Sequence, residues 1–161
     1  MKIIYSKIFL LIISVIFISS CVSESEREAL SLYKSAKISY QNQEYEETIT
    51  KISKALDLTN DGGPHSAFND GSVRLLLGRA YQALQKHENA LQEYSKAIML
   101  GKKFLQSHML NSDPTPYAKR DFKRNILSDY YFTRAVLYKK LGKIKLYNED
   151  IEMFKKWNNA K

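Results

Sequence analysis

The chain has 161 residues, which is enough for one domain with a substantial core and too few for two large ones. Aromatic residues, most of them tyrosine, make up 12% of the chain, and there are only six glycines and three prolines; this composition excludes a disordered chain and suits a helical one. The net charge is +8, the single cysteine excludes an intrachain disulfide or a cysteine-rich metal site, and the three histidines lack the helical i, i+4 spacing of metal ligands.

The first 20 residues have the features of a signal peptide. Two lysines precede an apolar segment, residues 8–18, which is interrupted only by Ser14. Eleven residues are too few to span a bilayer, which takes about 20, but they fit the apolar region of a signal peptide. The residues that follow, Ser19, Ser20 and Cys21, complete with Ile18 a motif that resembles the lipobox of bacterial lipoproteins.

This resemblance implies that residues 1–20 are removed and that Cys21 is lipidated and becomes the first residue of the mature chain. It also implies a short tether, residues 21–25, and a domain held at the outer membrane or cell surface, with a periplasmic orientation possible. Val22 stands where an aspartate would mark inner-membrane retention. The alternatives are an ordinary cleaved signal peptide and an uncleaved anchor with an incidental cysteine.

The mature chain begins with the pattern of a helix hairpin. Ser25 and Glu28 have the spacing of a capping box, and apolar residues recur three and four positions apart from Ala29 onward. Residues 42–44 break this period, which resumes at Tyr45. Two helices joined by a short turn are therefore predicted, and the same pattern predicts an all-α fold for residues 26–161.

The hairpin pattern occurs three times. Aligning Ala36 with Gly78 gives an offset of 42 residues, and aligning Gly78 with Ala135 gives an offset of 57. Small residues recur because two helices approach closely only where one side chain is minimal. This small–aromatic–small pattern resembles the tetratricopeptide (TPR) repeat, which implies a solenoid of about three hairpins, with the degenerate third as a terminal cap. The expected repeats are 29–62, 71–104 and 128–161, with insertions at 63–70 and 105–127.

The segment before the third repeat has its own helix signal. Residues 117–141 contain neither glycine nor proline, and Pro116 suits the first position of a helix. The first helix of the third hairpin is therefore predicted to extend backwards by about three turns.

The TPR resemblance also implies a partner-binding groove, lined by the first helix of each hairpin. Carried over by position, the lining consists of aromatic, basic, amide and apolar residues: Tyr33, Lys37, Tyr40, Gln41, Leu75, Arg79, Gln82, Phe132, Val136, Lys139 and Lys140. Aromatic side chains beside lysine and arginine suit an extended or helical peptide of acidic character. The alternative is that Tyr33, Tyr40 and Phe132 are ordinary core residues.

Charge is unevenly distributed along the chain, with a net charge of −2 over residues 21–100 and +8 over residues 101–161. Four cations lie in pairs one helical turn apart in the expected extension: Lys119, Arg120, Lys123 and Arg124. Like charges at this spacing repel and destabilise a helix, so binding of an anionic partner would reduce this repulsion. Anionic lipid head groups or an acidic protein are expected rather than nucleic acid, because the chain is exported; a solvated basic face is the alternative.

No arrangement of residues suggests catalysis. The adjacent carboxylates Glu46 and Glu47 point to different faces of a helix, and no nucleophile–base pair or phosphate-binding glycine loop is recognisable. We therefore expect no enzyme activity, no cofactor and no metal. The resemblances together imply a lipid-anchored scaffold that binds a protein or peptide in an envelope assembly or transport complex. Two alternatives are a small-molecule-binding accessory lipoprotein of a transporter and a surface-exposed lipoprotein that contacts host molecules.

Overall fold

The computed structural model describes residues 23–59, 71–111 and 126–159. The expected signal peptide and Cys21, the 63–70 insertion and the four paired cations between residues 119 and 124 lie outside these ranges. Within them the chain forms six helices and no strand, which confirms the predicted all-α class.

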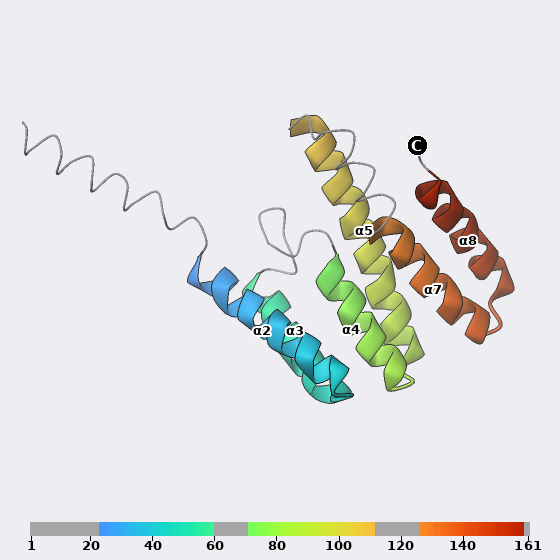
Figure 1. Cartoon of the computed structure of the whole chain (residues 1–161). Coiled ribbons are helices and arrows are strands. Elements are labelled where there is room, and N and C mark those ends of the chain that lie inside the picture. The colour runs from blue at the N-terminus through green and yellow to red at the C-terminus, as the bar shows by residue number, and fades with distance from the viewer. Residues whose placement is uncertain (1–22, 60–70, 112–125, 160–161) are drawn as a thin grey trace, which may run out of the picture.

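The six helices pair into three antiparallel hairpins that pack side by side (Figure 1). Within the stack, α3 of the first hairpin packs against α4 of the second, and α5 packs against α7 of the third. The hairpins are formed in chain order by α2 (Glu24–Gln41) with α3 (Tyr45–Leu58), α4 (Ser72–Ala83) with α5 (His87–Asn111), and α7 (Ser128–Lys140) with α8 (Ile144–Asn158).

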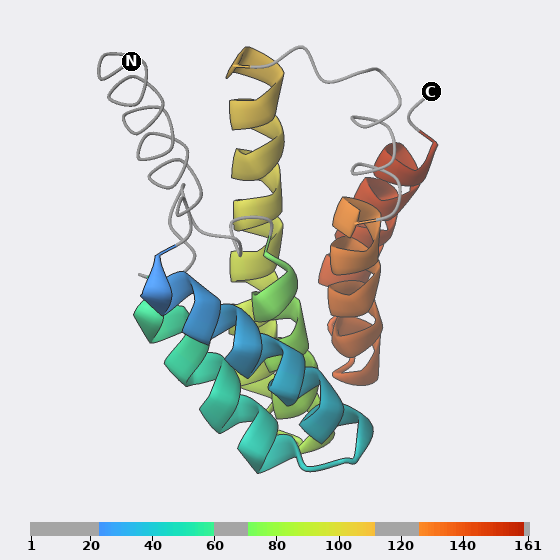
Figure 2. The same cartoon turned by 60° about the vertical axis from the view of Figure 1, so that its left-hand side comes forward.

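The three hairpin turns share one backbone conformation. Gln43, Gln85 and Gly142 each have a positive φ, of 66°, 59° and 70°, and their spacing reproduces the predicted offsets of 42 and 57 residues. The N–H of each donates to the carbonyl oxygen three residues earlier, at 3.0 to 3.1 Å. In both views the turns lie at one edge of the molecule (Figures 1 and 2). The internal repeat is therefore visible in the backbone itself.

Small residues lie where helices come closest, as the repeat pattern predicts. A Cβ added to Gly78 would lie 2.5 Å from Cε1 of Tyr94, so the tyrosine ring of α5 rests directly on the backbone of α4. Seven alanines are fully buried at the other helix contacts: Ala29, Ala36, Ala55, Ala80, Ala90, Ala97 and Ala135. Around them, one apolar cluster joins the first and second hairpins and another joins the second and third.

Arg134 ties the third hairpin to the second. Its guanidinium makes two hydrogen bonds of 2.8 Å to the buried carboxylate of Asp150 on α8 and a third, also of 2.8 Å, to the hydroxyl of Ser95 on α5. It also lies over the rings of Tyr131 and Tyr138. Burial lowers the pKa of Arg134, but the hydrogen bonds and charge of Asp150 outweigh this effect, so the pKa is raised overall.

The first helix begins two residues earlier than predicted. The capping box is formed by Ser23 and Glu26: the Ser23 hydroxyl accepts a 3.2 Å hydrogen bond from the Glu26 N–H, and the Glu26 carboxylate accepts one of 3.4 Å from the Ser23 N–H. Ser25, the predicted cap, instead bonds the Ser23 hydroxyl from within the helix. Residues 24 and 25 therefore belong to α2 and not to a tether.

The second hairpin is longer than the repeat pattern predicts. Helix α5 continues to Asn111, so residues 105–111, expected to begin an insertion, extend the helix instead. Its Gly101 is buried and does not end it, and Pro114 is the next strong helix breaker in the sequence. At the third hairpin, residues 126 and 127 form a π-type turn before α7, and the rest of the predicted backward extension lies outside the described residues.

Candidate functional site

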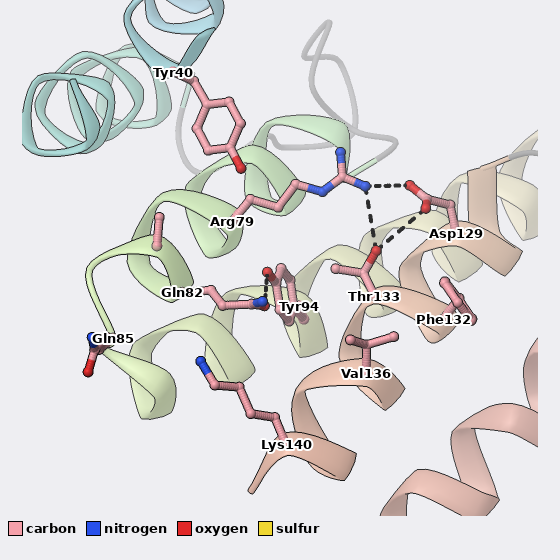
Figure 3. A pocket seen from close by; sticks show the side chains of 11 residues that line it. Tyr40, Arg79, Gln82, Gln85, Tyr94, Asp129, Phe132, Thr133, Val136 and Lys140 are labelled. Carbon is pink, nitrogen blue, oxygen red and sulfur yellow. Dashed lines mark hydrogen bonds and ion pairs between the residues drawn. The ribbon is translucent and has the colours of Figure 1, made fainter. Parts of the chain in front are cut away.

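A pocket of about 610 Å³ opens between the first helices of the three hairpins (Figure 3). Helices α2, α4, α5 and α7 and the second turn all contribute to it. Its lining residues are Tyr40, Arg79, Gln82, Ala83, Gln85, Tyr94, Asp129, Phe132, Thr133, Val136 and Lys140.

The floor of the pocket is a fixed tyrosine. Tyr94 is fully buried against Gly78, and its hydroxyl donates a 2.8 Å hydrogen bond to Oε1 of Gln82 (Figure 3). Burial raises the pKa of Tyr94, an effect that the positive charge of Arg79 opposes only in part. The phenol therefore stays neutral, and its hydrogen bond holds the Gln82 side chain at the pocket.

An ion pair bridges the pocket from α4 to α7. Nη2 of Arg79 lies 3.0 Å from Oδ2 of Asp129 and 3.5 Å from the hydroxyl of Thr133. Both charged side chains are about 40% exposed, so solvent screens the pair, and its contribution to stability is small. The pair fixes the Arg79 guanidinium at one end of the pocket and neutralises its charge.

One face of α7 supplies the opposite wall. Phe132, Val136 and Lys140 follow one another at intervals of four residues and so lie in a row on the helix. Phe132 and Val136 are 45% and 44% exposed, and the Phe132 ring rests on that of Phe154, with 5.2 Å between the centroids. Lys140 makes no ion pair with any described residue. This wall can therefore hold an apolar side chain beside a carboxylate.

Six of the eleven residues predicted for the groove line this pocket: Tyr40, Arg79, Gln82, Phe132, Val136 and Lys140. Leu75 does not line the pocket, because its side chain is only 7% exposed and belongs to the core between the second and third hairpins. The other four lie elsewhere on the three hairpins, outside the pocket lining.

Those four predicted residues have other neighbours. Tyr33 is half-buried against the core of the first two hairpins, and the Lys37 ammonium lies over its ring at 5.9 Å. Gln41 is exposed at the end of α2. The Lys139 ammonium lies over the ring of Tyr147, 5.5 Å from its centroid, and so faces α8.

Positional analogy to the repeat missed five lining residues: Ala83, Gln85, Tyr94, Asp129 and Thr133. Tyr94 belongs to a second helix, and only the absence of a side chain at Gly78 lets its ring reach the pocket. That pairing could have been inferred from the sequence, since a glycine within a helix often marks a close approach. Asp129 could not, because its partner Arg79 is 50 residues away along the chain.

The described residues contain no group of three or more His, Cys, Asp or Glu side chains that could hold a metal ion. Over the same residues, no helix combines the length and apolarity needed to cross a bilayer. Comparison with protein-family models and with curated proteins finds no match to this chain.

Proposed function

We propose that this chain is a lipid-anchored, TPR-like scaffold of the bacterial cell envelope, and that its inter-hairpin groove binds a peptide or helix of a partner protein. The three equivalent turns and the small residues at the helix contacts support a TPR-like stack. The lipobox-like motif ending at Cys21 supports the anchor.

The pocket wall on α7 is the observation that carries the binding proposal. Phe132 and Val136 are large apolar side chains that remain almost half exposed inside a hollow, where burying them against a partner would be favourable. Lys140 lies at the same wall without a partner among the described residues. The groove therefore suits a segment that presents an apolar side chain followed by a carboxylate, in an assembly or transport complex.

Site-specific photo-crosslinking tests this proposal. A photoreactive residue at Val136, inside the groove, should give one covalent adduct with an envelope protein in intact cells. The same residue at Met99, which is 60% exposed on α5 and does not line the groove, should give none. Adding Lys140→Glu should abolish the adduct at position 136, while circular dichroism shows that the fold is retained. Equal adducts at both positions would place the partner elsewhere.

A second function is favoured by the size of the pocket alone. A volume of about 610 Å³ lies within the range of small-molecule sites, roughly 300 to 1,000 Å³. A small-molecule-binding accessory protein would retain a ligand through purification. Native mass spectrometry distinguishes the two functions, because a bound small molecule without a protein partner supports this second function.

A further inference from the structure

The turn of the third hairpin differs from the other two in charge. Over equivalent ten-residue windows, the first turn (residues 39–48) has three acidic residues and no basic one, and the second (residues 81–90) has one of each. The third (residues 138–147) has four lysines and no acidic residue. Four lysines and two apolar residues form what we call the basic tip: Lys139, Lys140, Lys143, Ile144, Lys145 and Leu146.

The fold does not require these side chains. All three turns share the left-handed residue and four equivalent main-chain hydrogen bonds, and the first two achieve this with other residues. Lys143 and Lys145 also stand at the start of α8, where the positive end of the helix dipole disfavours cations. None of the four lysines makes an ion pair with a described residue. Lys139 lies over the ring of Tyr147, and the other three lysines have no such contact among the described residues, so they can contact a partner outside the chain.

Two apolar side chains stand among these lysines. Ile144 is 55% exposed and Leu146 is 38% exposed. In the second turn, the position equivalent to Leu146 is the polar Asn89. Because Ile144 and Leu146 are two residues apart on a helix, they point to different sides of the tip rather than to one flat patch.

The exposure and composition of the tip indicate the partner. Every residue from Gly142 to Leu146 is exposed, and the turn lies at the edge of the stack (Figure 2). A flat protein surface would cover only one of the sides to which Ile144 and Leu146 point, whereas a lipid interface can surround both. Lysines attract the head groups of anionic lipids, and exposed isoleucine and leucine gain by entering the boundary of the acyl chains.

We propose that the basic tip is a membrane-contact site that inserts Ile144 and Leu146 into the interface of an anionic bilayer. This site is distinct from the groove: of its residues only Lys140 lines the pocket, and the variants below leave Lys140 unchanged. The site also needs neither the lipid anchor nor the groove partner in order to act.

Vesicle co-sedimentation of the full chain tests the charge requirement. The measured quantity is the anionic preference, that is, binding to phosphatidylcholine vesicles with about 30% phosphatidylglycerol divided by binding to vesicles of phosphatidylcholine alone. A ratio is used because the apolar N-terminal segment contributes to binding of both kinds of vesicle. Lys143→Glu/Lys145→Glu should lower this preference by at least roughly tenfold, and about 0.5 M salt should do the same. Lys34→Glu/Lys103→Glu, which changes the net charge equally at exposed sites away from the tip, should retain the wild-type preference.

A fluorescent probe tests insertion directly. In the Cys21→Ser background, an environment-sensitive dye on Leu146→Cys should shift to the blue with anionic vesicles. The same dye on Asn89→Cys, at the equivalent position of the second turn, should not shift. Equal responses at the two positions, or no preference of the wild-type chain for anionic vesicles, would overturn the proposal and leave the tip to an acidic protein partner. If the chain binds anionic vesicles but gives no crosslink through position 136, the proposed groove function is refuted and the membrane-contact site is not.

Discussion

Gly78 determines the shape of the pocket floor. Without a side chain there, the ring of Tyr94 lies against the backbone of α4 and reaches Gln82. Glycine inside a helix costs about 1 kcal/mol relative to alanine. The close approach of Tyr94 explains why this glycine stands in the middle of α4.

Gly78→Ala should destabilise the protein despite the better helix propensity of alanine. The new Cβ would lie 2.5 Å from a ring that is fully buried and cannot move freely, and overpacking of this kind costs about 1–3 kcal/mol. Urea unfolding measures the change. A variant more stable than wild type would show that the ring can move aside.

Tyr94 should make stability fall at alkaline pH. Because burial raises its pKa, the folded chain keeps the phenol proton where the unfolded chain, with a tyrosine pKa of about 10, has lost it. The contribution of Tyr94 is therefore complete below pH about 10 and decreases as pH rises above it, by up to about 1.4 kcal/mol per pH unit.

Comparing wild type with Tyr94→Phe isolates this effect. The variant loses the hydrogen bond to Gln82 at every pH, which lowers its stability by a constant amount of about 1 kcal/mol. Above pH about 10, its free energy of unfolding should decline less steeply than that of wild type. Parallel curves would mean that Tyr94 ionises in the folded state as readily as in the unfolded one.

At the scale of the elements, the turns are the clearest repeated feature. A side chain in the left-handed region is strained, and two of the three turns place a glutamine there while the third uses glycine. The chain therefore contains both the strained and the relaxed version of the same turn.

Gln43→Gly should stabilise the protein by about 0.5–1 kcal/mol, because it removes this strain without removing a packed side chain. Gly142→Ala should destabilise it by about 1 kcal/mol through strain alone, since no atom lies within 4 Å of the added Cβ. Thermal and urea unfolding of both variants measure whether their stabilities change in these opposite directions. Shifts in the same direction would show that the turns are not equivalent.

Local patterns were sufficient to predict the helices and turns. Apolar periodicity and small residues depend on neighbours within one hairpin, and the predicted offsets recur in the turn backbone. Local pattern does not fix the helix boundaries: both Ser23 and Ser25 have a glutamate three residues later, so either pair matches the capping-box pattern at the start of α2. The repeat length predicts an end of α5 seven residues before Asn111, because it takes no account of where the next helix breaker stands.

The pocket was predicted only in part, for a different reason. Six lining residues follow from their position on a first helix. Burial of Leu75 depends on how the second and third hairpins pack, and the pair of Arg79 with Asp129 crosses between them. Contacts between hairpins separated by an insertion are not specified by local pattern.

At the scale of the whole molecule, Arg134 holds α7 to α8 through Asp150 and to the second hairpin through Ser95. Removing one partner of a buried ion pair leaves the other uncompensated, which costs about 3–5 kcal/mol. Arg134→Ala should therefore destabilise the protein by about that amount, through Asp150, whose side chain is only 6% exposed. Urea unfolding measures it. The double variant Arg134→Met/Asp150→Leu should recover most of the loss, and a double variant as unstable as the single one would contradict this explanation.

The first and last helices have polar residues at positions where inner helices have buried apolar ones. Val73 and Leu77 of α4 are buried in the cluster shared with the first hairpin, but their equivalents in α2 are Ser31 and Ser35. At the other end, Ile98 of α5 is buried, and its equivalent in α8 is the exposed Lys155. If the hairpins are repeats, this loss of buried apolar residues is the pattern expected of terminal ones.

The common backbone of the turns has a consequence for how this protein can diversify. The path of the chain is set by one left-handed residue and a few main-chain hydrogen bonds, so the exposed side chains around it are exchangeable. Acidic, neutral and lysine-rich sets already occupy the three sites within one polypeptide. New binding properties can therefore arise through a few substitutions in the exposed turns, without any change to the buried core.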